Sequence, residues 1–307
     1  MKCIFMGTPE IAATLLKNML NANIHVDLVV TQPDKKKGRK QILVYSPVKE
    51  VAVANDIPVF QPVHIKDDYQ QIIDCQPDVI VTCAYGQIVP QQVLDAPTFG
   101  CVNLHGSLLP KYRGGAPIQR AIWDGCKESG MSLMKMAFKM DAGPVLAYKR
   151  IHILPEDNCT SVFEKMGIAA SELLIDKWDE IISGKAQYIE QDETKVTYAP
   201  VIKKEEEKID LSQSDEKICD QIRALSYQPG GYVMIKGKKF KILKATYQKV
   251  NVSLPFQILG LFEDGYGITL KDGILYVQEC QMEGKPMMKA KDFYNGQGRN
   301  LVSTMIE

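Results

Sequence analysis

The first 105 residues of the chain alternate short apolar runs with segments of helical spacing. The apolar runs are rich in Val, Ile and Cys, which is typical of strands buried on both faces of a parallel sheet. They fall at residues 3–6, 26–30, 79–83 and 101–104. Helical spacing lies between them, at residues 10–20, 48–54 and 69–73. The repetition predicts a doubly wound α/β domain, which binds ligands at the carboxyl ends of its strands.

Beyond residue 105 the alternation changes. The pattern predicts a helix over residues 116–123, two strands at residues 132–138 and 145–153, and a long amphipathic helix over residues 161–182. The long helix is expected to begin at a capping box formed by Ser161 and Glu164 and to end at Gly184. Its apolar side indicates a role in core packing.

From residue 186 to residue 207 the apolar residues follow neither helical nor strand spacing, so we place a linker there. A helix is predicted over residues 215–225, and short strands with turns follow it at residues 233–235, 240–243, 267–270 and 274–277. The sequence therefore predicts two domains. Residues 1–207, including the linker, form the α/β domain, and residues 208–307 form a small β-rich, barrel-like domain.

Composition supports this outline, because 307 residues with 45% hydrophobic and 24% charged side chains are typical of a globular protein of two domains. The 37 basic and 37 acidic side chains cancel, which argues against a uniformly basic nucleic-acid binder. The charge is unevenly spread, however, since residues 208–307 contain 14 basic and 11 acidic side chains. Two basic clusters stand out, Lys35, Lys36, Lys37, Arg39 and Lys40, and Lys236, Lys238, Lys239, Lys241, Lys244 and Lys249. They are either solvated faces or phosphate-binding surfaces.

The eight cysteines show no metal-ligand spacing, so we expect free thiols and no metal. The chain starts directly with a strand-like run, and no apolar run is long enough to span a bilayer. We therefore expect a cytoplasmic protein without a membrane partner. The expected oligomeric state is a monomer.

Candidate chemistry concentrates in residues 100–117. Asn103 and His105 alternate at the end of a buried strand, so their side chains share a face. A lone histidine there is usually structural, but an amide and an imidazole together can polarise a carbonyl. Asp141, in a turn between two apolar runs, could orient the imidazole, although an aspartate before Ala-Gly is most often a turn former. These residues alone allow acyl transfer or hydrolysis.

A longer pattern surrounds these residues. The run Asn103-x-His105-x-Ser107-Leu108-Leu109-Pro110-x-Tyr112-Arg113-Gly114, followed by Asp141-x-Gly143, resembles the signature of the folate-dependent formyltransferases. Further matching segments are Phe5-Met6-Gly7-Thr8-Pro9, Thr31-Gln32-Pro33-Asp34, Ala84-Tyr85-Gly86-Gln87-Ile88 and Thr197-Tyr198-Ala199-Pro200. The resemblance covers both domains and is greatest to the members that formylate methionyl-tRNA.

The resemblance implies a Rossmann-like formyltransferase domain and a C-terminal OB-like β-barrel domain that helps to hold tRNA. It also implies transfer of the formyl group of 10-formyltetrahydrofolate to the α-amine of methionine on initiator methionyl-tRNA, for translation initiation. Asn103, His105 and Asp141 would be the catalytic residues. The first two would stabilise the oxyanion, His105 would protonate the departing folate nitrogen, and Asp141 would stabilise the imidazolium and accept the proton of the amine.

The same resemblance implies two binding regions. Folate would lie against two loops, formed by Ser107, Leu108, Leu109 and Pro110 and by Tyr85, Gly86, Gln87 and Ile88. Leu108 and Leu109 could equally belong to the core. The tRNA acceptor end would contact the loop at residues 34–49, through Arg39 with Lys37 and Lys40, and further contacts are expected at Lys238, Lys239 and Lys241. The sequence departs from the family pattern at Pro144, at residues 226–229 and in the three lysines at 35–37.

Three alternative functions compete with this interpretation. A sister enzyme could formylate a small amine, such as glycinamide ribonucleotide or an amino sugar, and a formyltetrahydrofolate hydrolase would use water instead. A non-catalytic RNA-binding module is the third. The lysine-rich loop and the basic second domain favour RNA over a small amine, while Asn103, His105 and Asp141 together disfavour the non-catalytic module.

Overall fold

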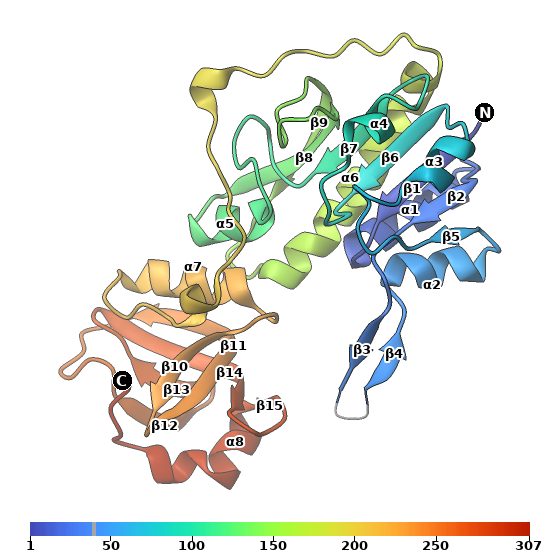
Figure 1. Cartoon of the computed structure of the whole chain (residues 1–307). Helices are drawn as coiled ribbons and strands as arrows, with labels where there is room; N and C mark the ends of the chain where they lie inside the picture. The colour runs from blue at the N-terminus through green and yellow to red at the C-terminus, as the bar shows by residue number, and fades with distance from the viewer. Residues whose placement is uncertain (39–40) are drawn as a thin grey trace. The chain divides into compact units, whose positions relative to one another are not determined.

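The computed structural model describes residues 1–38 and 41–307, which form two compact units (Figure 1). The first unit comprises Met1–Pro117, Glu128–His152 and Phe163–Ala199. The second comprises Ile118–Lys127, Ile153–Val162 and Pro200–Glu307. Because the units are interleaved along the chain, the boundary expected at residue 207 stays a prediction.

A seven-stranded sheet forms the centre of the first unit, with strand order β5-β2-β1-β6-β7-β8-β9. Its first five strands are parallel, and β8 and β9 extend it antiparallel. The bounds are β1 (Cys3–Gly7), β2 (Leu28–Val30), β5 (Val59–Phe60), β6 (Val79–Cys83), β7 (Cys101–His105), β8 (Glu128–Lys135) and β9 (Val145–His152). All five residues of β1 and of β6 are buried, as their continuous apolar runs require. The predicted α/β fold class is confirmed.

The order of the parallel strands fixes where a ligand can bind. The chain passes from β1 outward to β2 and β5 and then returns to β6 on the other side of β1. The strand order therefore reverses between β1 and β6, and the carboxyl ends of strands flank the crevice at such a point. At these ends, the Thr8 hydroxyl donates to the Tyr85 carbonyl over 2.9 Å.

The helices of the α/β region lie close to their predicted positions, except for the short α4, which was not expected. They are α1 (Glu10–Asn21), α2 (Pro47–Ala54), α3 (Gln70–Asp74), α4 (Gln91–Leu94), α5 (Pro117–Trp123) and α6 (Cys159–Ile182). The expected capping box at Ser161 and Glu164 is wrong. The Asn158 side chain accepts from the Ser161 amide, and the Ser161 hydroxyl accepts from the Asn158 amide, both over 3.1 Å. The reciprocal box thus lies three residues earlier, where Asn158 is the stronger cap.

Strand β5 was not among the expected strands, and two further differences concern β8 and a hairpin. The strand expected at residues 132–138 is β8, Glu128–Lys135, because Gly130 interrupts the apolar pattern while the close approach of the Lys149 carbonyl requires a glycine there. A separate hairpin, β3 (Lys35–Lys37) and β4 (Ile42–Val44), was not expected. Three consecutive lysines carry neither an alternating pattern nor a high strand propensity.

The second unit contains an antiparallel sheet with the order β10-β11-β14-β13-β12, and β15 pairs with β14. The bounds are β10 (Gly231–Ile235), β11 (Lys238–Lys249), β12 (Ile258–Phe262), β13 (Gly265–Thr269), β14 (Gly273–Met282) and β15 (Met288–Lys289). Phe240, Tyr266 and Phe293 pack in its core, with the Phe293 ring centroid 5.0 and 5.2 Å from the other two. The predicted β-rich second domain is confirmed.

Helical segments complete the second unit. Helix α7 (Asp215–Leu225) has its predicted bounds, and the Ser214 hydroxyl caps it by accepting from the Lys217 amide. Helix α8 (Ala290–Gly296) was not expected. Short 3-10 turns lie at Glu193–Lys195 in the first unit and at Lys204–Glu207 and Gly298–Leu301 in the second.

Candidate active site

Asn103 and His105 lie at the carboxyl end of β7, beside β6 on one side and β8 on the other. His105 is buried and Asn103 half-buried, and their alternate positions place both side chains on one face of the sheet. No hydrogen bond in the described part of the chain engages the side-chain amide of Asn103. Its donors are therefore free to act on a ligand at this edge.

The imidazole of His105 lies between two oxygen acceptors. Its Nε2 is 2.9 Å from the Tyr112 carbonyl oxygen, and its Nδ1 is 3.5 Å from Oδ1 of Asp141. The side chains of His105 and Asp141 are 7% and 15% exposed, so little water screens this pair. The carboxylate is placed to stabilise positive charge that develops on the ring during proton transfer.

Asp141 is held in a turn with unusual backbone geometry. Its φ is +51°, and its Oδ2 accepts from the Gly114 amide over 2.8 Å. Two residues later, a Cβ at Gly143 would lie 1.9 Å from the Lys135 carbonyl oxygen. Only glycine fits at that distance, which explains the Asp-x-Gly spacing physically. The structure therefore brings His105 and Asp141 together, as the sequence predicted.

The loop after β7 is stabilised mostly by its own hydrogen bonds. The Ser107 hydroxyl donates to the Lys111 carbonyl over 2.6 Å. The hydroxyl of buried Ser132, on β8, donates to the Ser107 carbonyl over 2.6 Å and accepts from the Leu109 amide over 3.0 Å. Leu109 itself is buried against Met134 and Val145. Leu108 and Pro110 are only half-buried, which leaves these two side chains for a ligand.

The second predicted folate segment follows β6. Tyr85 is buried in the core, and burial raises the pKa of its hydroxyl to about 12. The Gln87 side chain accepts from the Ile65 amide and donates to Gln32 Oε1, so it anchors the loop. Gly86 has a φ of +92° that favours glycine, whereas Ile88 is 69% exposed. Of these four residues, Ile88 presents the most apolar surface to a ligand.

Several residues near the site were not singled out from the sequence. The segment at residues 187–199, expected to be part of a linker, pairs with the loop that follows residue 110. The Arg113 amide donates to the Thr197 carbonyl over 2.9 Å, and the Ala199 amide donates to the Arg113 carbonyl over 2.7 Å. Gly114 permits this approach, because a Cβ there would lie 2.7 Å from the Ala199 oxygen. The Thr197-Tyr198-Ala199-Pro200 match was the only sequence signal for this contact.

The predicted RNA-binding residues belong to two segments of the chain, residues 37–40 and residues 238–241. Arg39 and Lys40 lie outside the described residues, and Lys37 belongs to β3. On β11, Lys238 is exposed, the Lys239 ammonium lies 4.0 Å from the centroid of the Tyr232 ring, and the Lys241 ammonium donates to the Pro229 carbonyl.

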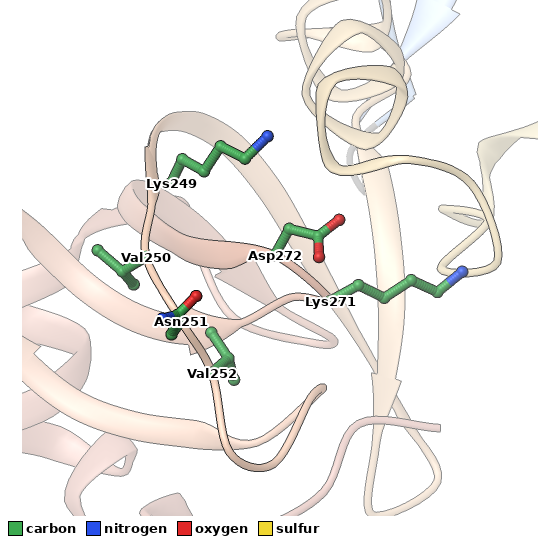
Figure 2. A pocket seen from close by; sticks show the side chains of 6 residues that line it. All are labelled: Lys249, Val250, Asn251, Val252, Lys271 and Asp272. Atoms are coloured by element: carbon green, nitrogen blue, oxygen red, sulfur yellow. The ribbon is translucent and has the colours of Figure 1, made fainter.

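A surface pocket of about 580 Å³ lies elsewhere in the second unit. Figure 2 shows its lining side chains, which come from residues 249–252 and from Lys271 and Asp272. The Lys271 ammonium donates to the Ser212 carbonyl over 2.6 Å. The pocket contains one member of the second basic cluster, Lys249, but none of the predicted site residues.

The described residues offer neither a metal cluster nor a helix able to span a membrane. Within residues 1–38 and 41–307, no three His, Cys, Asp or Glu side chains are grouped to hold a metal ion. None of the described helices combines the length and apolar character needed to span a bilayer. All eight cysteines are free thiols.

Family comparisons cover nearly the whole chain. The formyl transferase family matches residues 1–177, and the formyl transferase C-terminal domain matches residues 201–298. The methionyl-tRNA formyltransferase of Lactobacillus delbrueckii subsp. bulgaricus is 42% identical over 98% of this chain and 96% of its own length. That of Dictyoglomus turgidum is 40% identical over 98% of both chains.

Solved structures show the same fold at lower identity. HypX from Aquifex aeolicus superposes with a TM-score of 0.73 at 18% identity, over 98% of this chain and 50% of that one. An N-formyltransferase from Helicobacter canadensis, in complex with folinic acid and dTDP-3-aminofucose, superposes with a TM-score of 0.67 at 20% identity, over 90% of this chain and 98% of that one. The fold, the family matches and the full-length identity agree. The chain therefore belongs to the formyl transferase family, among the methionyl-tRNA formyltransferases.

Proposed function

We propose that the protein transfers the formyl group of 10-formyltetrahydrofolate to the α-amine of methionine on initiator methionyl-tRNA. The observation that carries this proposal is the pair of buried His105 and half-buried Asp141 beside Asn103, in a chain that matches methionyl-tRNA formyltransferases over nearly its full length. Residues of one chain supply all three side chains, so the proposed site needs no second copy. We accordingly propose a monomer that acts in the cytoplasm, where charged tRNA is used.

The three residues suit formyl transfer to an amine. Attack of a neutral amine on the formyl carbon places negative charge on the formyl oxygen. Asn103 and His105 would donate to that oxygen, with Nε2 of His105 exchanging the Tyr112 carbonyl for the substrate. One such donor lowers the barrier by roughly 3–4 kcal/mol. His105 would then give a proton to the folate nitrogen as its bond to the formyl carbon breaks. Asp141 would stabilise the imidazolium and accept, through water, the proton that the amine loses.

Folate is proposed to lie between the loops that follow β6 and β7. These strands are adjacent and parallel, so the two loops meet at one edge of the sheet. Among the predicted folate residues, Ile88, Leu108 and Pro110 keep exposed or half-buried apolar side chains, while the others contribute backbone or support the loops. A HypX structure contains tetrahydrofolic acid, which supports folate binding by this fold.

Charged tRNA is proposed to contact both basic regions. The hairpin of β3 and β4 presents Lys35 and Lys36 on one exposed strand and apolar side chains on the other, with Ile42 60% exposed. Such a surface offers ammonium groups to phosphates and apolar contacts to bases. Arg39 and Lys40 follow β3 in sequence and are proposed as acceptor-end contacts, with Lys238, Lys239 and Lys241 as contacts of the second unit.

A formylation assay tests the proposal. Purified protein is mixed with 10-formyltetrahydrofolate and, in separate reactions, initiator methionyl-tRNA, elongator methionyl-tRNA, glycinamide ribonucleotide, a nucleotide-linked amino sugar or no acceptor. We expect formylmethionyl-tRNA with the initiator, and we expect His105→Ala to lower its rate at least about 100-fold. His64→Ala, at an exposed histidine, is the matched control and should leave the rate unchanged.

Each acceptor separates one alternative. Preferential formylation of a small amine would show a sister activity, and release of formate without an acceptor would show a hydrolase. Retention of full activity in His105→Ala would contradict the assignment of this residue.

A further inference from the structure

Both the nitrogen and the oxygen of the Gln191 side-chain amide make two hydrogen bonds, and those of the nitrogen go to the turn that carries Asp141. Its Nε2 donates to the Asp141 carbonyl over 2.8 Å and to the Gly143 carbonyl over 2.7 Å. Its Oε1 accepts from Nε and Nη2 of Arg113, over 3.1 and 2.8 Å. One half-buried amide thus connects the turn that carries Asp141 to the loop that carries Arg113.

Arg113 determines which way this amide points. The guanidinium is only 1% exposed, and besides Gln191 it contacts Oε1 of Glu193 over 2.7 Å. A guanidinium has donors only, so it must face the oxygen of Gln191. The amide nitrogen is therefore directed at the Asp141 turn. Glu193, which is 59% exposed and also pairs with Lys139, balances the charge of the buried arginine.

The Asp141 turn needs such a support. A non-glycine residue at a φ of +51° is strained, and such strain persists only when the surroundings hold it. Gln191 holds the backbone on both sides of Ala142, at Asp141 and Gly143. Together with the Gly114 amide, this fixes the carboxylate 3.5 Å from His105. A shift of about 1 Å at such a pair is enough to cost a large factor in rate.

We propose that Gln191, oriented by the buried guanidinium of Arg113, is a positioning residue for Asp141. It acts through the backbone of the turn and does not touch the substrates. The proposal rests on the proposed formyl transfer, in which Asp141 is catalytic. It assigns to the segment after α6 a direct part in the geometry of the active site.

Gln191→Glu is the sharpest test, because it keeps the shape of the side chain and an oxygen for Arg113 but replaces two donors by an acceptor that faces two carbonyls. We expect kcat to fall by about 10- to 100-fold, while KM for folate and for charged tRNA stays within about twofold. Gln187→Glu makes the same charge change at an exposed glutamine of the same segment and should match the wild type. Melting temperatures measured in parallel identify any loss of folding.

Two further variants keep the test decisive if Gln191→Glu folds poorly. Arg113→Lys keeps the charge near Glu193 but loses the two-pronged contact with Gln191, so kcat should fall about 3- to 10-fold at unchanged KM. Glu193→Gln leaves the contact of Arg113 with Gln191 in place and should retain kcat. Wild-type kcat in both Gln191→Glu and Arg113→Lys would overturn the inference, as would a loss confined to KM. Inactivity of the wild type and Gln187→Glu toward methionyl-tRNA would instead refute the proposed function.

Discussion

At the scale of single residues, the proposed site combines strained backbone with dense hydrogen bonding. Ala84, Tyr112 and Asp141 have φ values of +46°, +60° and +51°, in the left-handed region that non-glycine residues rarely adopt. Each costs on the order of 1 kcal/mol or more. The Tyr112 carbonyl contacts His105, and the Tyr85 carbonyl after Ala84 accepts from Thr8 and Gln32. Strain at this edge is thus offset by contacts that fix the groups proposed for chemistry.

Ser132→Ala should loosen the loop after β7. The change removes the partner of two buried backbone groups, the Ser107 carbonyl and the Leu109 amide, and should lower the free energy of unfolding by about 1–3 kcal/mol. Because the loop is the proposed folate contact, KM for folate should rise more than kcat falls. Denaturant unfolding and steady-state kinetics measure the two effects. Ser132→Thr, which retains a hydroxyl, is the matched comparison. A wild-type KM for folate in Ser132→Ala would contradict the prediction that Ser132 supports the folate-binding loop.

At the scale of elements, the turn between β8 and β9 shows how one glycine sets the position of a side chain. Residue 143 comes so close to the Lys135 carbonyl that any Cβ would clash with backbone. The Lys135 amide in turn donates to the Pro144 carbonyl over 2.9 Å, which closes the turn. The position of Asp141 therefore depends on the pairing of the two strands as well as on its own contacts.

Gly143→Ala should accordingly damage both stability and rate. The clash requires a backbone shift, and we expect a loss of about 3 kcal/mol in the free energy of unfolding. At temperatures where the variant stays folded, kcat should be at least about tenfold lower, because the Asp141 turn moves. Ala142→Gly, in the same turn, is the comparison variant, because it adds no atom that could clash with the Lys135 carbonyl. Normal kcat in folded Gly143→Ala would show that the turn tolerates displacement.

The hairpin of β3 and β4 is anchored at its base by an ion pair. Asp34 precedes β3, and Lys49 lies on α2, which follows β4. The Lys49 Nζ lies 2.5 Å from Oδ2 of Asp34, and both side chains are at most 15% exposed. Gln61 bonds to both residues, and Lys49 lies 4.0 Å from the centroid of the Tyr45 ring. Burial alone would raise the pKa of Asp34, but the hydrogen bonds from Lys49 and Gln61 outweigh it, so the pKa is lowered.

This lowered pKa gives a pH-dependent prediction. An aspartate with a folded pKa below its unfolded value of about 3.9 contributes stability above that value and loses the contribution as pH falls through the folded pKa. Asp34→Asn should therefore lower the melting temperature by about 2–4 °C at pH 7. The difference in melting temperature between Asp34→Asn and the wild type should narrow below about pH 4. Calorimetry across pH 3–8 measures it, with Asp56→Asn, at an exposed turn, as the control. A gap independent of pH would contradict the ionic character of the anchor.

At the scale of the whole molecule, the neutral total charge conceals two basic regions. Residues 208–307 carry 14 basic and 11 acidic side chains, and the hairpin carries consecutive lysines at 35–37. Association with a polyanion depends on local charge, because each phosphate contact releases condensed counterions. Net charge alone would have excluded the tRNA substrate that the full-length relatives indicate.

Replacement of Lys238, Lys239 and Lys241 by Gln should weaken tRNA use without affecting chemistry. We expect a higher KM for charged tRNA, an unchanged kcat at saturation, and a log–log dependence of binding on salt that is shallower by about 1–2. Lys17, Lys66 and Lys185, all exposed in the first unit, provide a charge-matched control triple. An unchanged salt slope would exclude phosphate contacts by the three β11 lysines.

Much of the fold could be predicted from sequence because its signals are local. Strands β1 and β6 are nearly continuous apolar runs, and α7 has its expected bounds. The proximity of His105 and Asp141 followed from a family pattern. Their catalytic roles, the folate and tRNA contacts and the domain boundary stay predictions.

What could not be predicted depends on tertiary contacts. Gln191 lies in a polar segment whose apolar residues follow neither helical nor strand spacing. Only its hydrogen bonds to Arg113 and to the Asp141 turn show that it lies beside the site. Tyr85 and Leu109 look like ligand contacts in the motif, yet their side chains pack in apolar clusters. The capping box of α6 was misplaced because Asn158 and Ser161 satisfy each other locally as well as any Ser-x-x-Glu pattern would.

The return of residues 187–199 to the loop after β7 sets a limit for protein engineering. A shortened enzyme that stopped where the first family match ends, at residue 177, would retain every catalytic candidate but lose Gln191 and the strand-like partner of Arg113. Exchange of C-terminal domains between related enzymes should therefore join the chains after Ala199. A chimera joined near residue 186 would combine Asp141 of one parent with residues 187–199, including the position of Gln191, of the other. Its turnover would depend on how well this segment of the second parent fits the Asp141 turn of the first.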